Sequence, residues 1–92
     1  MSDELISLRE ALRTLVLDAS EKSEPAGGLA PDEILFSSES RLQLDSLDAL
    51  QISMAIQKRF GIRITDSKET RRALATLQDM AEYLHAKGAR AP

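Results

Sequence analysis

The 92-residue sequence contains no cysteine, and this absence excludes several kinds of chemistry at once. A chain without thiols has no disulfide framework, no cysteine nucleophile and no thiolate ligand for a metal ion. Any sulfur chemistry must therefore come from a cofactor. The single histidine, His85, has no sequence-adjacent acid suited to a triad, and the chain has neither a glycine-rich phosphate loop nor a cluster with metal-ligand spacing. We therefore expect no metal site and no catalysis by this chain alone.

Aromatic residues and long apolar runs are also scarce. Only 3% of the residues are aromatic whereas 42% are hydrophobic, so the core must consist mainly of aliphatic side chains, which suit packed helices better than a twisted sheet. No run approaches the ~20 apolar residues of a membrane span, and the first residues are acidic where a signal peptide would be basic. The sequence therefore predicts an all-α, cytoplasmic protein without membrane insertion.

Basic residues are outnumbered, which gives the chain a formal charge of −3. Nonspecific binding to nucleic acid needs a basic surface, so no nucleic-acid partner is expected. The charge is unevenly spread, because residues 1–40 hold nine acidic and three basic residues whereas residues 41–92 hold six acidic and nine basic ones. Partner proteins can therefore recognise either the acidic residues of the first part or the basic residues of the second.

The first predicted helix covers residues 3–19, where leucine and valine recur at steps of three and four. Prolines and glycines follow it, so residues 20–31 are expected to form a long loop. After this loop, residues 31–36 could form a short helical turn that packs Ile34 or Phe36 inward.

The second predicted helix covers residues 46–60. Asp45 is its expected N-cap, Asp48 occupies a capping-box position three residues later, and Gly61 offers a left-handed C-cap. Two neighbouring apolar stripes give this helix a wide apolar surface. One stripe holds Leu47, Leu50, Met54 and Gln57, and the other holds Ala49, Ile52, Ile56 and Phe60.

Two further helices are expected in the last third of the chain. Two side chains of residues 62–64 are expected to pack into the core. Thr65 or Asp66 is then expected to cap a short helix that ends near Leu74. A second capping-box pattern at residues 76–79 starts a final helix, which ends before Gly88.

The residue that could carry chemistry is Ser46, which the pattern places at the very start of the second helix. There its hydroxyl projects near the positive end of the helix dipole, where a phosphate is electrostatically tolerated. Serine at this position is also typical of an ordinary helix cap, so its position alone leaves both interpretations open.

Residues 44–50, Leu-Asp-Ser-Leu-Asp-Ala-Leu, resemble the attachment motif of acyl carrier proteins. The similarity continues in order through residues 54–56, 60–64, 76–79 and 83–84, and it covers roughly residues 3–86. It implies a single carrier domain, a four-helix bundle with three long helices, one short helix and a long first loop. The expected domain spans residues 1–92, with an ordered core at 3–86 and a C-terminal tail at 88–92.

The resemblance also implies a cofactor and a role for the residues around it. Ser46 would take 4'-phosphopantetheine from coenzyme A in a reaction catalysed by a separate, magnesium-dependent phosphopantetheinyl transferase, and Asp45 would help to position the metal in that complex. The thiol of the arm would carry growing or starter acyl chains as thioesters. Met54, Ile52, Ile56 and Phe60 would then serve as core residues and as walls for a partly sheltered acyl chain.

The partners implied are a ketosynthase, an acyltransferase, and ketoreductase- and dehydratase-type enzymes, which a monomeric carrier would meet in turn. Contacts with them are expected near the arm, at Leu47, Asp48, Leu50, Gln51 and Met54. Leu47 could equally be an ordinary core residue, since its spacing allows either role.

The chain departs from the family pattern in the helix after the serine. In fatty-acid carriers this helix is rich in glutamate, whereas here Asp48 is its only acid and Lys58 and Arg59 are basic. The departure favours a dedicated set of partner enzymes whose surfaces differ. Residues 66–69, Asp-Ser-Lys-Glu, resemble carriers of specialised fatty-acid-like or polyketide pathways, those of aryl polyene synthesis included. A peptidyl or aryl carrier, or a helical adaptor that is never modified, are the alternative interpretations.

Overall fold

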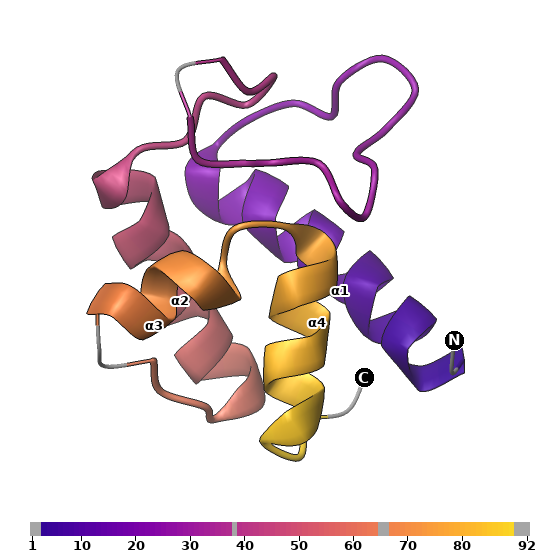
Figure 1. Cartoon of the computed structure of the whole chain (residues 1–92), viewed down its shortest axis with the longest axis vertical. Helices are drawn as coiled ribbons and strands as arrows, with labels where there is room; N and C mark the ends of the chain where they lie inside the picture. Colours follow the sequence, from indigo (N-terminus) through magenta and orange to yellow (C-terminus); the bar gives the residue numbers. More distant parts are fainter. Residues whose placement is uncertain (1–2, 38, 65–66, 90–92) are drawn as a thin grey trace.

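The computed structural model describes residues 3–37, 39–64 and 67–89, and within these ranges it contains four α-helices and no strand (Figure 1). The helices are α1 (Asp3–Ser20), α2 (Ser46–Phe60), α3 (Ser67–Ala73) and α4 (Leu77–Ala86). The predicted all-α class, with one short helix third in order, is confirmed. The caps predicted at Thr65 or Asp66 lie outside the described residues.

Local sequence signals fix both ends of α2 where they were predicted. The Asp45 carboxylate accepts a hydrogen bond from the Asp48 backbone N–H, and the Asp48 carboxylate accepts one from the Asp45 N–H, each at 3.0 Å. At the other end Gly61 has a φ of 71°, a left-handed conformation that glycine adopts without steric cost. Its N–H donates to the Gln57 carbonyl at 2.9 Å, which completes the C-cap.

The α4 helix begins at a polar cap, as predicted from the second capping-box pattern. The Thr76 hydroxyl accepts from the Asp79 N–H at 3.0 Å, which forms the forward half of the box. The helix ends at Ala86, and Gly88 follows with a φ of 93°. His85, in the last turn, is exposed, and its Nε2 lies 3.9 Å from the Glu4 carboxylate.

An aliphatic core joins the helices. The α1 helix packs against both α2 and α4, and α3 packs against α4, while the segment between α1 and α2 arches over one end of the bundle (Figure 1). Ile62 and Ile64 pack partly buried against this core, as expected for residues 62–64. No described helix is long and apolar enough to cross a membrane. The largest fully buried side chains are Leu8, Leu12, Val16, Leu35, Ile52, Ile56, Leu74, Met80 and Leu84.

The short helical turn predicted for residues 31–36 was wrong. The segment is not helical, and Leu35 is its fully buried residue. Ile34 is 53% exposed, whereas Phe36 is half-buried and packs against the core, as one of the two predicted alternatives had it. The reason lies in its hydrogen bonds. The Leu35 N–H donates to the Ala75 carbonyl at 3.0 Å and its carbonyl accepts from the Leu44 N–H at 3.2 Å, so the backbone is satisfied by distant segments and not by a helix.

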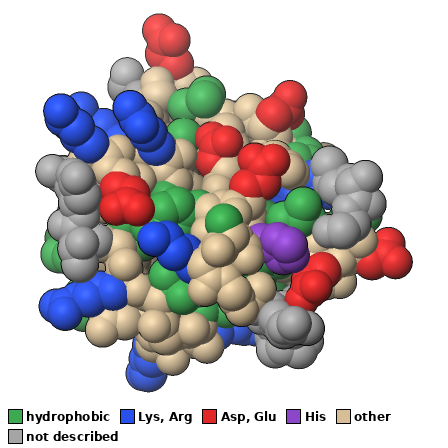
Figure 2. All heavy atoms as spheres, turned by 60° about the horizontal axis from the view of Figure 1, so that its bottom comes forward, with side chains coloured by type: hydrophobic (Ala, Val, Ile, Leu, Met, Phe, Trp, Pro, Cys, Tyr) green, Lys and Arg blue, Asp and Glu red, His purple; other side chains and the backbone are tan. Residues whose placement is uncertain are grey.

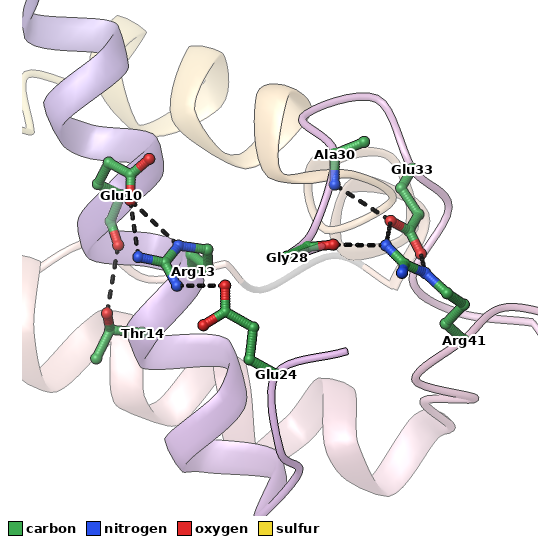
Figure 3. A network of polar contacts seen from close by, with 8 residues as sticks. All are labelled: Glu10, Arg13, Thr14, Glu24, Gly28, Ala30, Glu33 and Arg41. Atoms are coloured by element: carbon green, nitrogen blue, oxygen red, sulfur yellow. Dashed lines mark hydrogen bonds and ion pairs between the residues drawn. The ribbon is translucent and has the colours of Figure 1, made fainter. Parts of the chain in front are cut away.

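Charged side chains hold the long loop between α1 and α2 in place (Figure 3). The Arg41 guanidinium donates to both carboxylate oxygens of Glu33, at 2.7 and 2.6 Å, and to the carbonyls of Ala26 and Gly28, at 2.9 and 2.6 Å. The hydrogen bonds from Arg41 hold the pKa of Glu33 below its usual value. One arginine thus holds three separate points of the segment between α1 and α2, namely Ala26, Gly28 and Glu33.

Candidate functional site

Ser46 is the first residue of α2, and its side chain is exposed. Asp45, directly before it, has extended backbone angles, and its carboxylate turns toward the helix to accept the Asp48 N–H. This backbone hydrogen bond is the main reason that the pKa of Asp45 lies below its ordinary value. Because Asp45 satisfies the cap, the neighbouring Ser46 hydroxyl is not needed for that role and stays accessible.

The electrostatic setting of Ser46 suits an anionic substituent. The first backbone N–H groups of α2 point toward this end, where the helix dipole is positive. A phosphodiester attached to the Ser46 oxygen would lie in that field. The two acids of the capping box are nearby, and their carboxylates are engaged with backbone N–H groups of the same turn.

A cavity of about 580 Å³ lies between α2 and α3 and reaches Ser46. Because Ser46 is exposed and also lines the cavity, it stands where the cavity opens to solvent. Most of the exposed wall area is apolar, although six of the twelve lining residues are polar or charged. The lining residues are Phe36, Ser37, Leu44, Asp45, Ser46, Ala49, Leu50, Ser53, Ile64, Thr70, Arg71 and Leu74.

The four residues predicted as core and as walls for the acyl chain are not walls of this cavity, although Ile52 and Ile56 are confirmed as core. Ile52 and Ile56 are fully buried in the core, Phe60 is half-buried against it, and Met54 is 58% exposed, and none of the four lines the cavity. The α1 helix decides this, because it packs on the α2 face that carries Ile52 and Ile56 and leaves the opposite face outward.

The outward face of α2 carries the residues expected to meet partners. Leu47 and Leu50 are 64% and 55% exposed, Met54 is exposed as well, and Gln51 shares their face. At 100° per residue, Lys58 falls on the same line as Leu47 and Met54. Asp48 lies at the edge of this face and is half-buried, so it is less exposed than the other predicted contact residues. The structure thus leaves an apolar stripe, ending in a cation, on the surface next to Ser46.

Comparison with known proteins identifies the family. Residues 10–84 match the family model described as the phosphopantetheine attachment site. An acyl carrier protein from Bdellovibrio bacteriovorus is 36% identical over 63 residues, which cover 66% of this chain and 78% of that protein. This chain belongs to the acyl carrier protein family. No solved structure matches it significantly.

An acyl carrier protein binds 4'-phosphopantetheine, and the local geometry fits that group. Ser46 offers an exposed hydroxyl at the positive end of a helix, and the cavity beside it is mostly apolar, as a thioester-bound acyl chain requires. Proteins of this family are generally not catalysts themselves, and they meet a phosphopantetheinyl transferase and synthesis enzymes. Among the described residues, no three His, Asp or Glu side chains gather as a metal site would require.

Four polar residues of the cavity were not predicted as site residues. They line it together with Ser46 and are Ser37, Ser53, Thr70 and Arg71. A signal for Ser53 was present, because it follows Ala49 and Leu50 by four and three positions and therefore interrupts an apolar stripe of α2 with a hydroxyl. Arg71 carried no such signal, since a basic residue on a short helix is typical of a solvated surface.

Proposed function

We propose that this protein carries acyl chains as thioesters on a 4'-phosphopantetheine arm attached to Ser46, and presents them to the enzymes of a fatty-acid-like or polyketide pathway. The observation that supports this most directly is the exposed hydroxyl of Ser46 at the start of α2, next to an apolar cavity and within the family motif. When bound, the arm supplies the terminal thiol that the cysteine-free chain lacks.

The chain contributes the nucleophile for attachment, and a transferase contributes the catalysis. The Ser46 oxygen would form a bond to the coenzyme A phosphorus next to the pantetheine, while the bond from that phosphorus to the bridging pyrophosphate oxygen breaks. Adenosine 3',5'-bisphosphate would leave, and the hydroxyl proton would pass to a base of the transferase. Asp45 offers a carboxylate beside the nucleophile, where it can help to position the magnesium ion of the transferase. Its capping-box bonds hold that carboxylate in place.

Partner enzymes would dock on the outward face of α2. Leu47, Leu50 and Met54 supply exposed apolar area, and Gln51 adds a neutral polar contact. Asp48 sits at the edge of this face with its carboxylate bound in the cap, so the face presents little negative charge. We therefore propose that the ketosynthase, acyltransferase, ketoreductase and dehydratase-type partners present apolar patches bordered by acidic residues.

The basic residues that border this face support an acidic partner surface. Lys58 and Arg59 lie in the last turn of α2, Arg63 follows that helix, and Arg71 and Arg72 lie on α3, all exposed. In the face shown in Figure 2, lysine and arginine side chains gather mainly at one side and acidic ones mainly at the other. Replacing Lys58 by glutamate should weaken binding to a partner ketosynthase at low salt, whereas Glu10→Gln on α1 should leave it unchanged.

The attachment site is tested by intact mass. The unmodified chain is incubated with coenzyme A, magnesium and a broad-specificity phosphopantetheinyl transferase, alongside Ser46→Ala and the control Ser7→Ala, which alters an exposed serine of α1. The wild type and Ser7→Ala should each gain one arm and Ser46→Ala none, with circular dichroism showing that all three are helical. A folded wild type that gains no arm would favour the unmodified adaptor instead.

A further inference from the structure

Ser53, one of the residues that line the cavity between α2 and α3, has a hydroxyl without a partner. The Ser53 Oγ is shielded from solvent and makes no hydrogen bond, and among the described residues it is the only buried side-chain nitrogen or oxygen in that condition. Buried polar groups are nearly always paired, because an unpaired one has lost its water without gaining a replacement. This hydroxyl therefore destabilises the unloaded fold.

The usual internal partner of a helical serine is not used here. A serine within a helix can donate to the carbonyl four residues earlier, and Ser20 of α1 does so, with its Oγ 2.6 Å from the Val16 carbonyl oxygen. Ser53 has the same opportunity with Ala49 but forms no such bond. The difference leaves its hydroxyl with donor and acceptor capacity that no group of the described chain uses.

Ser53 is placed within reach of a chain attached at the cavity mouth. It follows Ser46 by seven residues, almost two helical turns, which puts it roughly 10 Å deeper along α2. The cavity that Ser53 lines also has aliphatic side chains in its wall, Leu50, Ile64 and Leu74 among them. Ser53 thus adds one unpaired hydroxyl to a wall that apolar and polar side chains share in equal number, six of each.

The other polar groups of the wall are engaged or solvated. The Ser37 hydroxyl accepts from the Glu39 N–H at 3.1 Å, and Thr70 has an interaction of its own within the chain. Arg71 is exposed, so its guanidinium is hydrated and discriminates weakly between bound chains. The polar selectivity of the cavity therefore depends on Ser53.

We propose that Ser53 makes this carrier selective for its cargo, so that the cavity holds acyl chains bearing a hydroxyl or keto oxygen more firmly than saturated chains of equal length. The proposal rests on the proposed function, since the cargo reaches the cavity from Ser46. A saturated chain would press methylene groups against the Ser53 hydroxyl and leave it unpaired. An oxygenated chain gives it a partner and buries its own oxygen with a hydrogen bond.

The test compares protection of two thioesters on the full-length chain. Wild type, Ser53→Ala and the control Ser7→Ala are loaded with hexanoyl or β-hydroxyhexanoyl arms, confirmed by intact mass, and the rate of thioester cleavage by hydroxylamine is followed. Each rate is divided by that of the same acyl group on free pantetheine, which removes intrinsic reactivity. Wild type and Ser7→Ala should protect the hydroxyacyl chain about two- to tenfold better than the saturated one, the range expected for one net hydrogen bond.

The outcomes separate this proposal from the one on which it depends. Loss of the preference in Ser53→Ala, with protection of the hexanoyl chain retained, supports a role for the hydroxyl. Equal protection of both chains by the wild type, or an unchanged preference in Ser53→Ala, overturns the proposal while the carrier function stands. If no variant accepts an arm at Ser46, the proposed function fails and the cargo proposal fails with it. Circular dichroism and thermal unfolding of Ser53→Ala show that the variant is folded.

Discussion

The two sides of this small bundle are built differently. Where α1 packs on α4, the interior is filled with aliphatic side chains, and Leu8, Leu12, Met80 and Leu84 have no exposed surface. Between α2 and α3 lies a cavity of about 580 Å³ with a buried hydroxyl, Ser53, in its wall. The packed side therefore stabilises the fold. On the hollow side, the cavity and the unpaired hydroxyl lower the free energy of unfolding close to Ser46, the candidate attachment residue.

Truncation of one leucine on each side should give the largest contrast. Leu84→Ala leaves a cavity in a fully packed region and should lower the free energy of unfolding by about 2–5 kcal/mol. Leu50→Ala, at a side chain that is 55% exposed, should cost less than about 1 kcal/mol. Urea unfolding followed by circular dichroism measures both. Equal losses would break the comparison between the two sides.

Removing the hydroxyl of Ser53 on the hollow side should raise the free energy of unfolding, whereas the leucine truncations lower it. Ser53→Ala relieves the unpaired polar group and adds a better helix former, so the free energy of unfolding of the unloaded chain should rise by about 1 kcal/mol. The matched change on α1 is Ser20→Ala, which removes a hydroxyl bonded to the Val16 carbonyl and should lower stability. A loss of stability in Ser53→Ala would mean that its hydroxyl is satisfied in solution.

A smaller effect concerns the link between the two sides. The Tyr83 hydroxyl on α4 donates to the Glu69 carboxylate on α3 at 2.5 Å, and this bond, followed by burial, raises the pKa of Tyr83 to about 12. Because this value lies above the ordinary one of about 10, the folded state favours neutral tyrosine. The resulting stabilisation is complete below about pH 10 and is lost as the pH rises toward 12.

Tyr83 is the only tyrosine, so tyrosinate absorbance reports this residue alone. Glu69→Gln removes the negative charge that opposes ionisation and should move the pKa of Tyr83 toward 10. An unchanged titration in the variant would show that Glu69 does not hold the hydroxyl, and that α3 is fixed to α4 by other contacts.

The features that could be predicted from the sequence depend on neighbours along the chain. The bounds of α2 follow from Asp45, Asp48 and Gly61, which cap it through bonds within one or two turns. The position of Ser46 at the helix start follows from the same cap. The helix type and order were predictable for the same reason, because apolar spacing and cap residues are local properties.

The features that could not be predicted depend on segments that meet only in the folded chain. Leu35 turns inward because Ala75 and Leu44 satisfy its backbone, and nothing within residues 31–36 indicates those partners. Two stripes of α2 are about equally apolar, and only the packing of α1 decides that Ile52 faces inward while Met54 faces solvent. The cavity needs α2 and α3 together, so its wall could not be assigned from either helix alone.

The most direct test of the account is a comparison of backbone amide chemical shifts between the chain with an unloaded arm and the chain with a hexanoyl arm. If the hollow side receives the cargo, shifts should concentrate at cavity residues such as Ala49, Ser53, Ile64 and Leu74, and spare Leu8, Leu12 and Leu84 on the packed side. Shifts confined to the surroundings of Ser46, or centred between α1 and α4, would contradict the division of this molecule into a structural and a functional side.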